Sequence, residues 1–278
     1  MAIIINPISP VAFSVFGLNI RWYALAYVAA FLIGFLVFRR LVSDKKNGSI
    51  LSDKQLDDLF TAVVLGVIIG GRLGYVLFYN LSFFIEYPLE ILAVWKGGMS
   101  FHGGLLGVLI SVLLFARKVE KQKSEKVKFW DWFNKSFKIM DAIAIVAPIG
   151  LFFGRIANFI NMEVMGRMTN RPWGVIFAGH GDVPRHPSPL YEASMEGIVL
   201  FIVMFCLWKF TKFNERAGVL SGIFAMLYAV FRICCEQFRA PDAQIGFLTS
   251  WGLTMGQLLS GLMFIAGAVI FTVAIKKK

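Results

Sequence analysis

The sequence predicts an all-α integral membrane protein with seven transmembrane helices and a small outward-facing head. Composition, the length of the apolar runs and the placement of lysine and arginine predict it. The chain has 278 residues, of which 58% are hydrophobic and 16% charged, and its mean hydropathy is +0.70. Soluble domains are about 45–50% apolar and about 25% charged. A cytosolic enzyme and a disordered chain are therefore excluded, because neither could keep this much apolar surface out of water.

Seven apolar runs are long enough to cross a bilayer. A helix needs about 20 mostly apolar residues to span a hydrocarbon core of about 30 Å. The expected spans are 22–38, 59–79, 99–116, 139–160, 190–208, 218–238 and 253–275. The last run carries no charge, and every run is too long and too continuous for the alternating strands of a membrane barrel.

Lysine and arginine alternate between the two sides of these spans. Nineteen of the 28 follow the first span, separate the third from the fourth, follow the fifth or end the chain. Cytoplasmic loops are enriched in these residues. We therefore expect a single polytopic domain over 1–278, with the N-terminus outside and the C-terminus in the cytoplasm. The net charge of +11 does not indicate nucleic acid, because the basic residues flank spans and do not cover one soluble face.

Residues 161–189 form the longest segment between two predicted spans. The segment is rich in glycine, proline and arginine, and the topology places it outside. A solvated loop and a functional head at the outer interface are both compatible with it, since long loops in compact folds often carry function.

Most polar residues within the spans lie at one depth. A charge in a membrane helix is costly, so such residues are functional candidates. All but Asp141, which lies at the inner mouth of the fourth span, belong to the outer half: Arg72, His102, Arg155, Asn158, Glu163, Glu192, Glu196, Arg232, Glu236 and Arg239. A transporter or channel needs polar groups through its full depth or a central site open to both faces. One-sided polarity favours an enzyme.

The arginines in this layer suit an anionic ligand. Tyr228, Arg232, Glu236 and Arg239 recur at helical spacing and form one polar stripe. One interpretation of these residues is that they form structural ion pairs between helices. If the carboxylates instead orient the guanidiniums, a lipid phosphate fits, because arginine offers a planar fork of donors that is always charged.

The glycines and His102 complete this layer. Glycines spaced by four residues predict close helix packing, and they also leave room for acyl chains. They are Gly66, Gly70 and Gly74, then Gly103 and Gly107, then Gly150 and Gly154. His102 lies beside Gly103 and Gly104, and it is interpreted either as a base or as a buried hydrogen-bonding residue. No nucleophile elbow, phosphate-binding loop or metal motif is present, so the nucleophile is expected to belong to a substrate.

Several motifs together resemble those of the prolipoprotein diacylglyceryl transferase family. They run in order from 21–23 (RWY) to 255–257 (MGQ), nearly the whole chain. Between these lie 70–75 (GGRLGY), 100–104 (SFHGG), 154–161 (GRIANFIN), 185–192 (RHPSPLYE) and 231–242, with Arg232, Glu236 and Arg239. Any one motif is weak, and the ordered set is specific.

The resemblance implies a seven-span enzyme of the bacterial cytoplasmic membrane, with its active site toward the outer leaflet. It implies transfer of the diacylglyceryl group of phosphatidylglycerol to the lipobox cysteine of a preprolipoprotein, without a metal or an organic cofactor. The family's important positions correspond to Tyr23, His102, Arg155, Asn158, Glu163, Gly166, Tyr228, Arg232, Glu236 and Arg239.

On this basis we expect three catalytic residues. Arg155 and Arg232 would stabilise the leaving phosphate, with Arg239 or Arg72 assisting, and His102 would take the thiol proton. The remaining positions would bind substrate. The alternative function is a transporter or flippase for an anionic lipid or metabolite, which shares the arginines but not the one-sided polarity.

Overall fold

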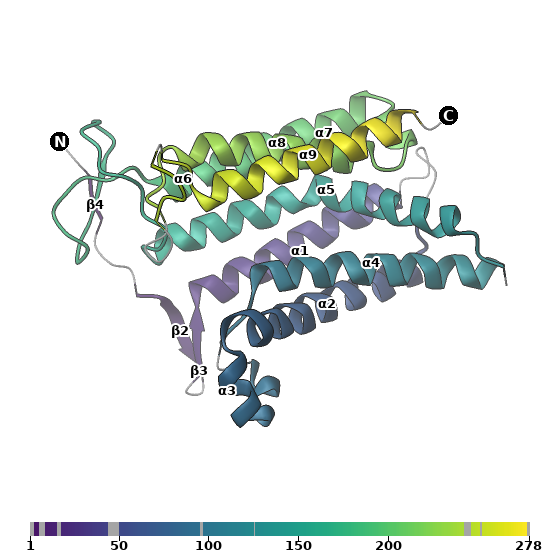
Figure 1. The fold of residues 1–278 in the computed structure, drawn as a ribbon, viewed down its shortest axis with the longest axis horizontal. Coiled ribbons are helices and arrows are strands. Elements are labelled where there is room, and N and C mark those ends of the chain that lie inside the picture. Colours follow the sequence, from purple (N-terminus) through teal and green to yellow (C-terminus); the bar gives the residue numbers. More distant parts are fainter. Residues whose placement is uncertain are drawn as a thin grey trace. The chain divides into compact units, whose positions relative to one another are not determined.

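A computed structural model describes residues 3–5, 9–15, 18–43, 50–94, 97–124, 126–241, 246–250 and 252–276. Its contacts divide the chain into two compact units, Met1–Phe38 with Asp141–Lys278, and Arg39–Met140. We call them unit 1 and unit 2, and Figure 1 traces the chain through both.

Helices dominate the described residues, which confirms the predicted class. The longer helices are α1 (Trp22–Val42), α2 (Asp53–Tyr79), α4 (Phe101–Lys123), α5 (Phe129–Ile160), α7 (Leu200–Phe210), α8 (Val219–Glu236) and α9 (Met255–Lys276). Shorter ones are α3 (Leu81–Glu86), η2 (Pro88–Leu92), α6 (Ser188–Glu192), η4 (Ala193–Val199) and η5 (Phe213–Glu215). The helix η4 is a π-helix that joins α6 to α7 without a break.

Among the described residues, six helical segments are long and apolar enough to cross a membrane. They are α1, α2, α5, the continuous segment Ser188–Phe210, α8 and α9. The predicted third span corresponds to the helix α4, which is not among the six. Residues 103–116 of α4 carry no charge, and Arg117 and Lys118 follow them. Seven spans remain a prediction.

The short strands are a departure from the all-helical expectation. β2 (Val11–Val15) and β3 (Leu18–Arg21) form an antiparallel hairpin before α1. β1 (Ile3–Ile5) pairs in parallel with β4 (Val175–Phe177), which lies in the 161–189 segment. Met162, Val175 and Phe177 form a small buried core under this pairing. Residues 161–189, which we call the head, therefore contain a strand and contribute to a small buried core, and their position outside the membrane stays a prediction.

The glycines spaced by four residues were predicted to allow close helix packing. This prediction is confirmed for α2 and α4 and is wrong for α5. In unit 2, a Cβ on Gly70 would lie 2.4 Å from the Gly103 carbonyl, and one on Gly107 would meet Gly66. The helices α2 and α4 therefore approach as closely as their backbones allow. In contrast, nothing lies within 4 Å of a Cβ on Gly150 or Gly154, so these glycines make no close helix contact.

Two sets of contacts hold the start of α8 in unit 1. Figure 1 shows α7, α8 and α9 running alongside one another. Gly222 of α8 and Gly267 of α9 allow a close crossing, where an added Cβ would meet the opposite backbone within 3 Å. At the start of α8, the Asp141 carboxylate accepts hydrogen bonds from the Gly218 and Ser221 amides, both at 2.7 Å. An acceptor there satisfies amides that have no partner within the helix.

Candidate active site

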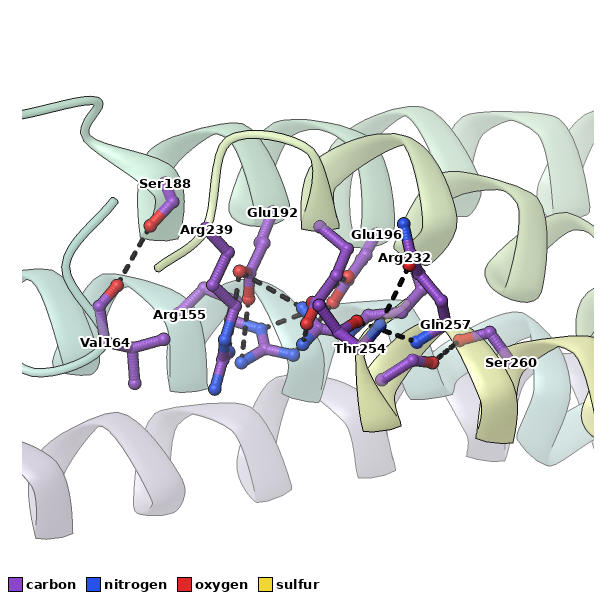
Figure 2. A network of polar contacts seen from close by, with 12 residues as sticks. Arg155, Val164, Ser188, Glu192, Glu196, Arg232, Arg239, Thr254, Gln257 and Ser260 are labelled. Carbon is purple, nitrogen blue, oxygen red and sulfur yellow. Dashed lines mark hydrogen bonds and ion pairs between the residues drawn. The ribbon is translucent and has the colours of Figure 1, made fainter. Parts of the chain in front are cut away.

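The predicted polar residues of unit 1 gather at one end of its helices. Arg155 lies near the end of α5, Glu192 at the end of α6, and Arg232 in the last turns of α8. Figure 2 shows these side chains converging, together with Glu196 and Arg239. Helical spacing brings Arg232 and Glu236 together at i and i+4.

We define the arginine cluster as Arg155, Arg232 and Arg239 with Glu192, Glu196 and Glu236. Arg155 contacts Glu192 at 2.9 Å and donates to Glu196 Oε2 from Nε and Nη2, at 3.3 and 3.0 Å. Arg232 contacts Glu192 at 3.1 Å and Glu196 at 3.6 Å, and its Nη2 lies 2.6 Å from Glu236. Arg239 completes the cluster 3.6 Å from Glu192.

Burial makes these charges interact strongly. The side chains of Glu192 and Glu196 have no exposed surface, whereas those of Arg155, Arg232 and Arg239 keep 18%, 11% and 14%. Glu192 and Glu196 therefore lie deepest in the site, and only the arginine side chains of these five residues keep some exposed surface. Three positive and three negative charges balance, which is what an apolar surrounding requires of buried ions.

Local backbone features fix this arrangement. The π-helix η4 follows Glu192 and contains Glu196, and π-helical turns occur often at functional sites. Gly197 in η4 faces α5 so closely that an added Cβ would lie 2.7 Å from the Phe152 Cβ. This close crossing brings Glu196 within reach of Arg155, one turn further along α5.

A second polar group lies between α1 and the start of the head. The Asn158 amide donates to Glu163 at 3.1 Å and to the Tyr23 hydroxyl at 3.4 Å. Glu163 lies between Met162 and Val164, whose φ angles are 54° and 58°. A β-branched residue in the left-handed region is strained, and such strain clusters at functional sites. Asn158 and Tyr23 offer uncharged hydrogen-bonding groups, and Glu163 offers a carboxylate. Such a combination suits the hydroxyl groups of a polyol.

Gly166 and Arg239 connect the head to α8. The Gly166 amide donates to the His186 carbonyl, and Gly166 forms an antiparallel bridge with Arg239. A Cβ at Gly166 would lie 2.2 Å from that carbonyl, so only glycine fits. The Arg167 side chain also donates to the Arg239 carbonyl at 2.9 Å. Gly166 therefore holds Arg239 through the backbone and does not itself face the cluster.

Tyr228 lies one turn before Arg232 on α8, within electrostatic range of Glu196 and Arg155. Its ring stacks on Phe224, and its part in binding substrate stays a prediction.

Arg72 lies in unit 2 and has different partners. Its side chain makes five hydrogen bonds, all to backbone carbonyls, and its guanidinium lies 5.0 Å from the Phe84 ring. The acceptors are Glu90, Ile91, Ala93, Gly97 and Gly98. An arginine has five N–H donors. These contacts give Arg72 a structural role, and the expectation that it assists phosphate binding has no support in the geometry.

His102 lies in the first turn of α4, where the Ser100 hydroxyl accepts a hydrogen bond from the Gly103 amide. Its side chain lies outside the described residues. The proposed base is therefore an expectation from the sequence.

The sequence named Glu192 and Glu196 as functional candidates without giving either a catalytic or substrate-binding role, and it did not single out Tyr27. The two glutamates carried a signal, since they are spaced by four residues in an apolar span. Tyr27 lies one turn after Tyr23, with ring centroids 5.1 Å apart. Among the described residues, no group of His, Cys, Asp and Glu side chains is arranged to hold a metal ion.

Comparison with known proteins identifies the family. The profile named prolipoprotein diacylglyceryl transferase matches residues 10–273. This chain belongs to that family. It is 46% identical over 272 residues to a protein of Rhodospirillum rubrum, covering 98% of this chain and 94% of that one.

Other relatives are similar to the same degree. A protein of Nitrobacter hamburgensis is 47% identical, covering 95% of this chain and 88% of its own length. One of Paramagnetospirillum magneticum is 45% identical, covering 97% and 95%. All three are named phosphatidylglycerol–prolipoprotein diacylglyceryl transferase. The family match extends across both units, so the arginine cluster lies within the residues that the profile matches.

Proposed function

We propose that this chain transfers the diacylglyceryl group of phosphatidylglycerol to the lipobox cysteine of a preprolipoprotein. The names of relatives that match almost its whole length support this reaction. The observation that links this reaction to particular residues is the arginine cluster, in which buried carboxylates pair with arginine side chains that keep some exposed surface.

The reaction requires stabilisation of a leaving phosphate. The cysteine sulfur attacks the terminal glyceryl carbon of the lipid, a C–S bond forms, and the C–O bond to phosphate breaks. Glycerol phosphate leaves with the bonding electron pair, and the thiol proton passes to a base. Arg155 and Arg232 meet the growing charge in a water-poor site, where fixed donors are most effective. In this proposal Arg239 extends the same face.

The second polar group, formed by Tyr23, Asn158 and Glu163, suits the glycerol part of the lipid head. Asn158 and Tyr23 offer hydrogen-bonding groups, and Glu163 accepts from the hydroxyls of a glycerol. Glu236 orients Arg232, and Tyr228 lines the same wall. His102 is our candidate for the base, because an imidazole titrates near neutral pH and can raise the thiolate fraction.

The membrane arrangement follows from the same proposal. We place α4 as the third of seven spans, the N-terminus outside and the C-terminus in the cytoplasm. The arginine cluster and the head then face the outer leaflet of the bacterial cytoplasmic membrane, where a secreted substrate presents its cysteine. The phosphatidylglycerol and the signal peptide would both approach from the bilayer.

A transporter or flippase is the weaker alternative. Charged residues are absent from 142–154, 197–208 and 219–231, which separate the cluster from Asp141. Unit 1 therefore offers no charged path from one end of its helices to the other, as a carrier for an anion would need.

A direct assay tests the function. The purified protein in phosphatidylglycerol nanodiscs should add the mass of one diacylglyceryl group to a lipobox peptide. A peptide with serine in place of cysteine, and nanodiscs of phosphatidylcholine alone, are the matched controls. The proposal is wrong if the cysteine peptide gains no mass, and movement of labelled lipid between leaflets without transfer would establish the alternative.

A further inference from the structure

We infer that Glu192 is a positioning residue that sets the common orientation of the three arginines for the departing phosphate. This inference rests on the proposed function and gives a definite role to Glu192, the last residue of the motif 185–192, which the sequence marked only as a functional candidate. Its role is to act through Arg155, Arg232 and Arg239 and not on the lipid itself.

The contacts single out Glu192 among the carboxylates of the cluster. Its Oε2 lies 2.9 Å from Arg155 Nη1, and its Oε1 lies 3.1 Å from Arg232 Nη1 and 3.6 Å from Arg239 Nη1. Glu192 therefore contacts all three arginines. The described ion pairs connect Glu196 to two of them and Glu236 to one.

The backbone holds Glu192 in place. It ends α6 and leads into the π-helix η4, and its side chain is fully buried. The neighbouring Ser188 hydroxyl donates to the Val164 carbonyl at 2.9 Å, which attaches α6 to the strained turn around Glu163 (Figure 2). A carboxylate fixed in this way cannot follow a moving ligand, but it can hold the three arginine side chains in a common orientation.

The direction of exposure separates Glu192 from the ligand. The arginine side chains keep a fraction of their surface, whereas Glu192 keeps none. A phosphate can therefore reach the arginines but not Glu192. Orientation of this kind affects the transition state most, since a misplacement of about 1 Å can cost about 10²-fold in rate.

The charge balance predicts an unusual kinetic signature. Replacing Glu192 by glutamine removes one negative charge and leaves the cluster with a net positive charge. Attraction for an anionic lipid is then kept or strengthened, whereas the common orientation of the arginines is lost. We therefore expect kcat to fall while KM for phosphatidylglycerol does not rise, which is the signature of an interaction needed mainly in the transition state.

The experiment compares Glu192→Gln, Glu192→Asp and Glu215→Gln in the peptide assay. Glu215 is an exposed glutamate of unit 1 at the other end of α7, and it controls for the loss of one charge. We expect Glu192→Gln to lower kcat by about 30-fold or more, with KM for phosphatidylglycerol within about twofold of wild type. Glu192→Asp should recover part of kcat, and Glu215→Gln should match wild type.

Several outcomes would overturn the inference. They are a wild-type kcat for Glu192→Gln, a rise in KM at constant kcat, or a loss of folded protein with normal kcat in the folded fraction. If the glutamine variant does not fold, Glu192→Asp decides alone: we expect kcat to fall about tenfold at unchanged KM, because its carboxylate is one methylene shorter. Wild-type protein that transfers no lipid would refute the proposed function instead, before any variant is compared.

Discussion

Unit 2 and unit 1 each bury arginines near the end of a long helix, but they give them different partners. In unit 2, Arg72 donates to five backbone carbonyls and packs against Phe84. In unit 1, Arg155 and Arg232 pair with carboxylates that lie beneath them. An arginine whose donors all meet the backbone fixes a loop, whereas one backed by carboxylates can still offer charge to a ligand. The partners of a buried arginine, and not its depth, separate the two roles.

The glycines of three helices show a related contrast. Those of α2 and α4 are in backbone contact, so unit 2 is closely packed there. Gly150 and Gly154 of α5 have open space beside them among the described residues, and Gly154 directly precedes Arg155. Spacing by four residues therefore led to close packing in α2 and α4 but not in α5.

Replacement of Arg155 should give the largest effect. Arg155→Lys keeps the charge but loses the planar fork that meets Glu192 and Glu196, so we expect transfer to fall by about 100-fold or more. The measurement is the rate of mass gain on the lipobox peptide, with thermal unfolding in detergent as the control for folding. Transfer within threefold of wild type, about 0.6 kcal/mol, would show that bidentate geometry does not matter.

Arg72→Lys should have the opposite profile. A lysine cannot serve five carbonyls, so we expect the free energy of unfolding to fall by about 2–4 kcal/mol. Per folded molecule, transfer should fall far less than for Arg155→Lys. Thermal unfolding and the peptide assay on the same preparations compare the two effects. A larger loss of specific activity for Arg72→Lys than for Arg155→Lys would reverse the assignment of roles.

A pair of alanine substitutions tests the glycine contrast. Gly70→Ala places a Cβ 2.4 Å from the Gly103 carbonyl, so α2 and α4 must separate, at a cost of about 1–3 kcal/mol. Gly150→Ala meets no atom and should be neutral or slightly stabilising, since alanine favours a helix. Unfolding temperatures in one detergent give the comparison. Equal shifts for both variants would contradict the difference in packing.

The smallest expected effect concerns pH and the head. Burial, with a contribution from Arg171, lowers the pKa of His186, whose Nδ1 lies 3.1 Å from the Tyr191 hydroxyl. The unfolded chain then binds the proton more readily, so stability is complete above about pH 6.5 and declines as pH falls from there through the folded pKa. We expect a loss below about 1 kcal/mol between pH 7 and pH 5. His186→Asn should remove this dependence, and unfolding temperatures at the two pH values would show whether it does.

The sequence alone determined the helical class of the protein and pointed to the candidate residues of its site. Runs of about 20 apolar residues have no stable form other than a membrane helix, and charges in such runs are too costly to be incidental. Ordered motifs along nearly the whole chain pointed to the transferase family, which the comparisons confirm. Helical spacing also placed Arg232 next to Glu236.

Only the tertiary structure decided how these residues are used. Arg72 and Arg155 look alike in sequence, because each follows a glycine near the end of an apolar run. Their partners lie 18–26 and 37–41 positions away along the chain, and no local pattern specifies such contacts. The same holds for the pairing of β1 with β4 and for the place of Glu192 among three arginines. The periodicity of a sequence indicates which face of a helix is polar. The way in which helices cross determines which charged residues on neighbouring helices meet.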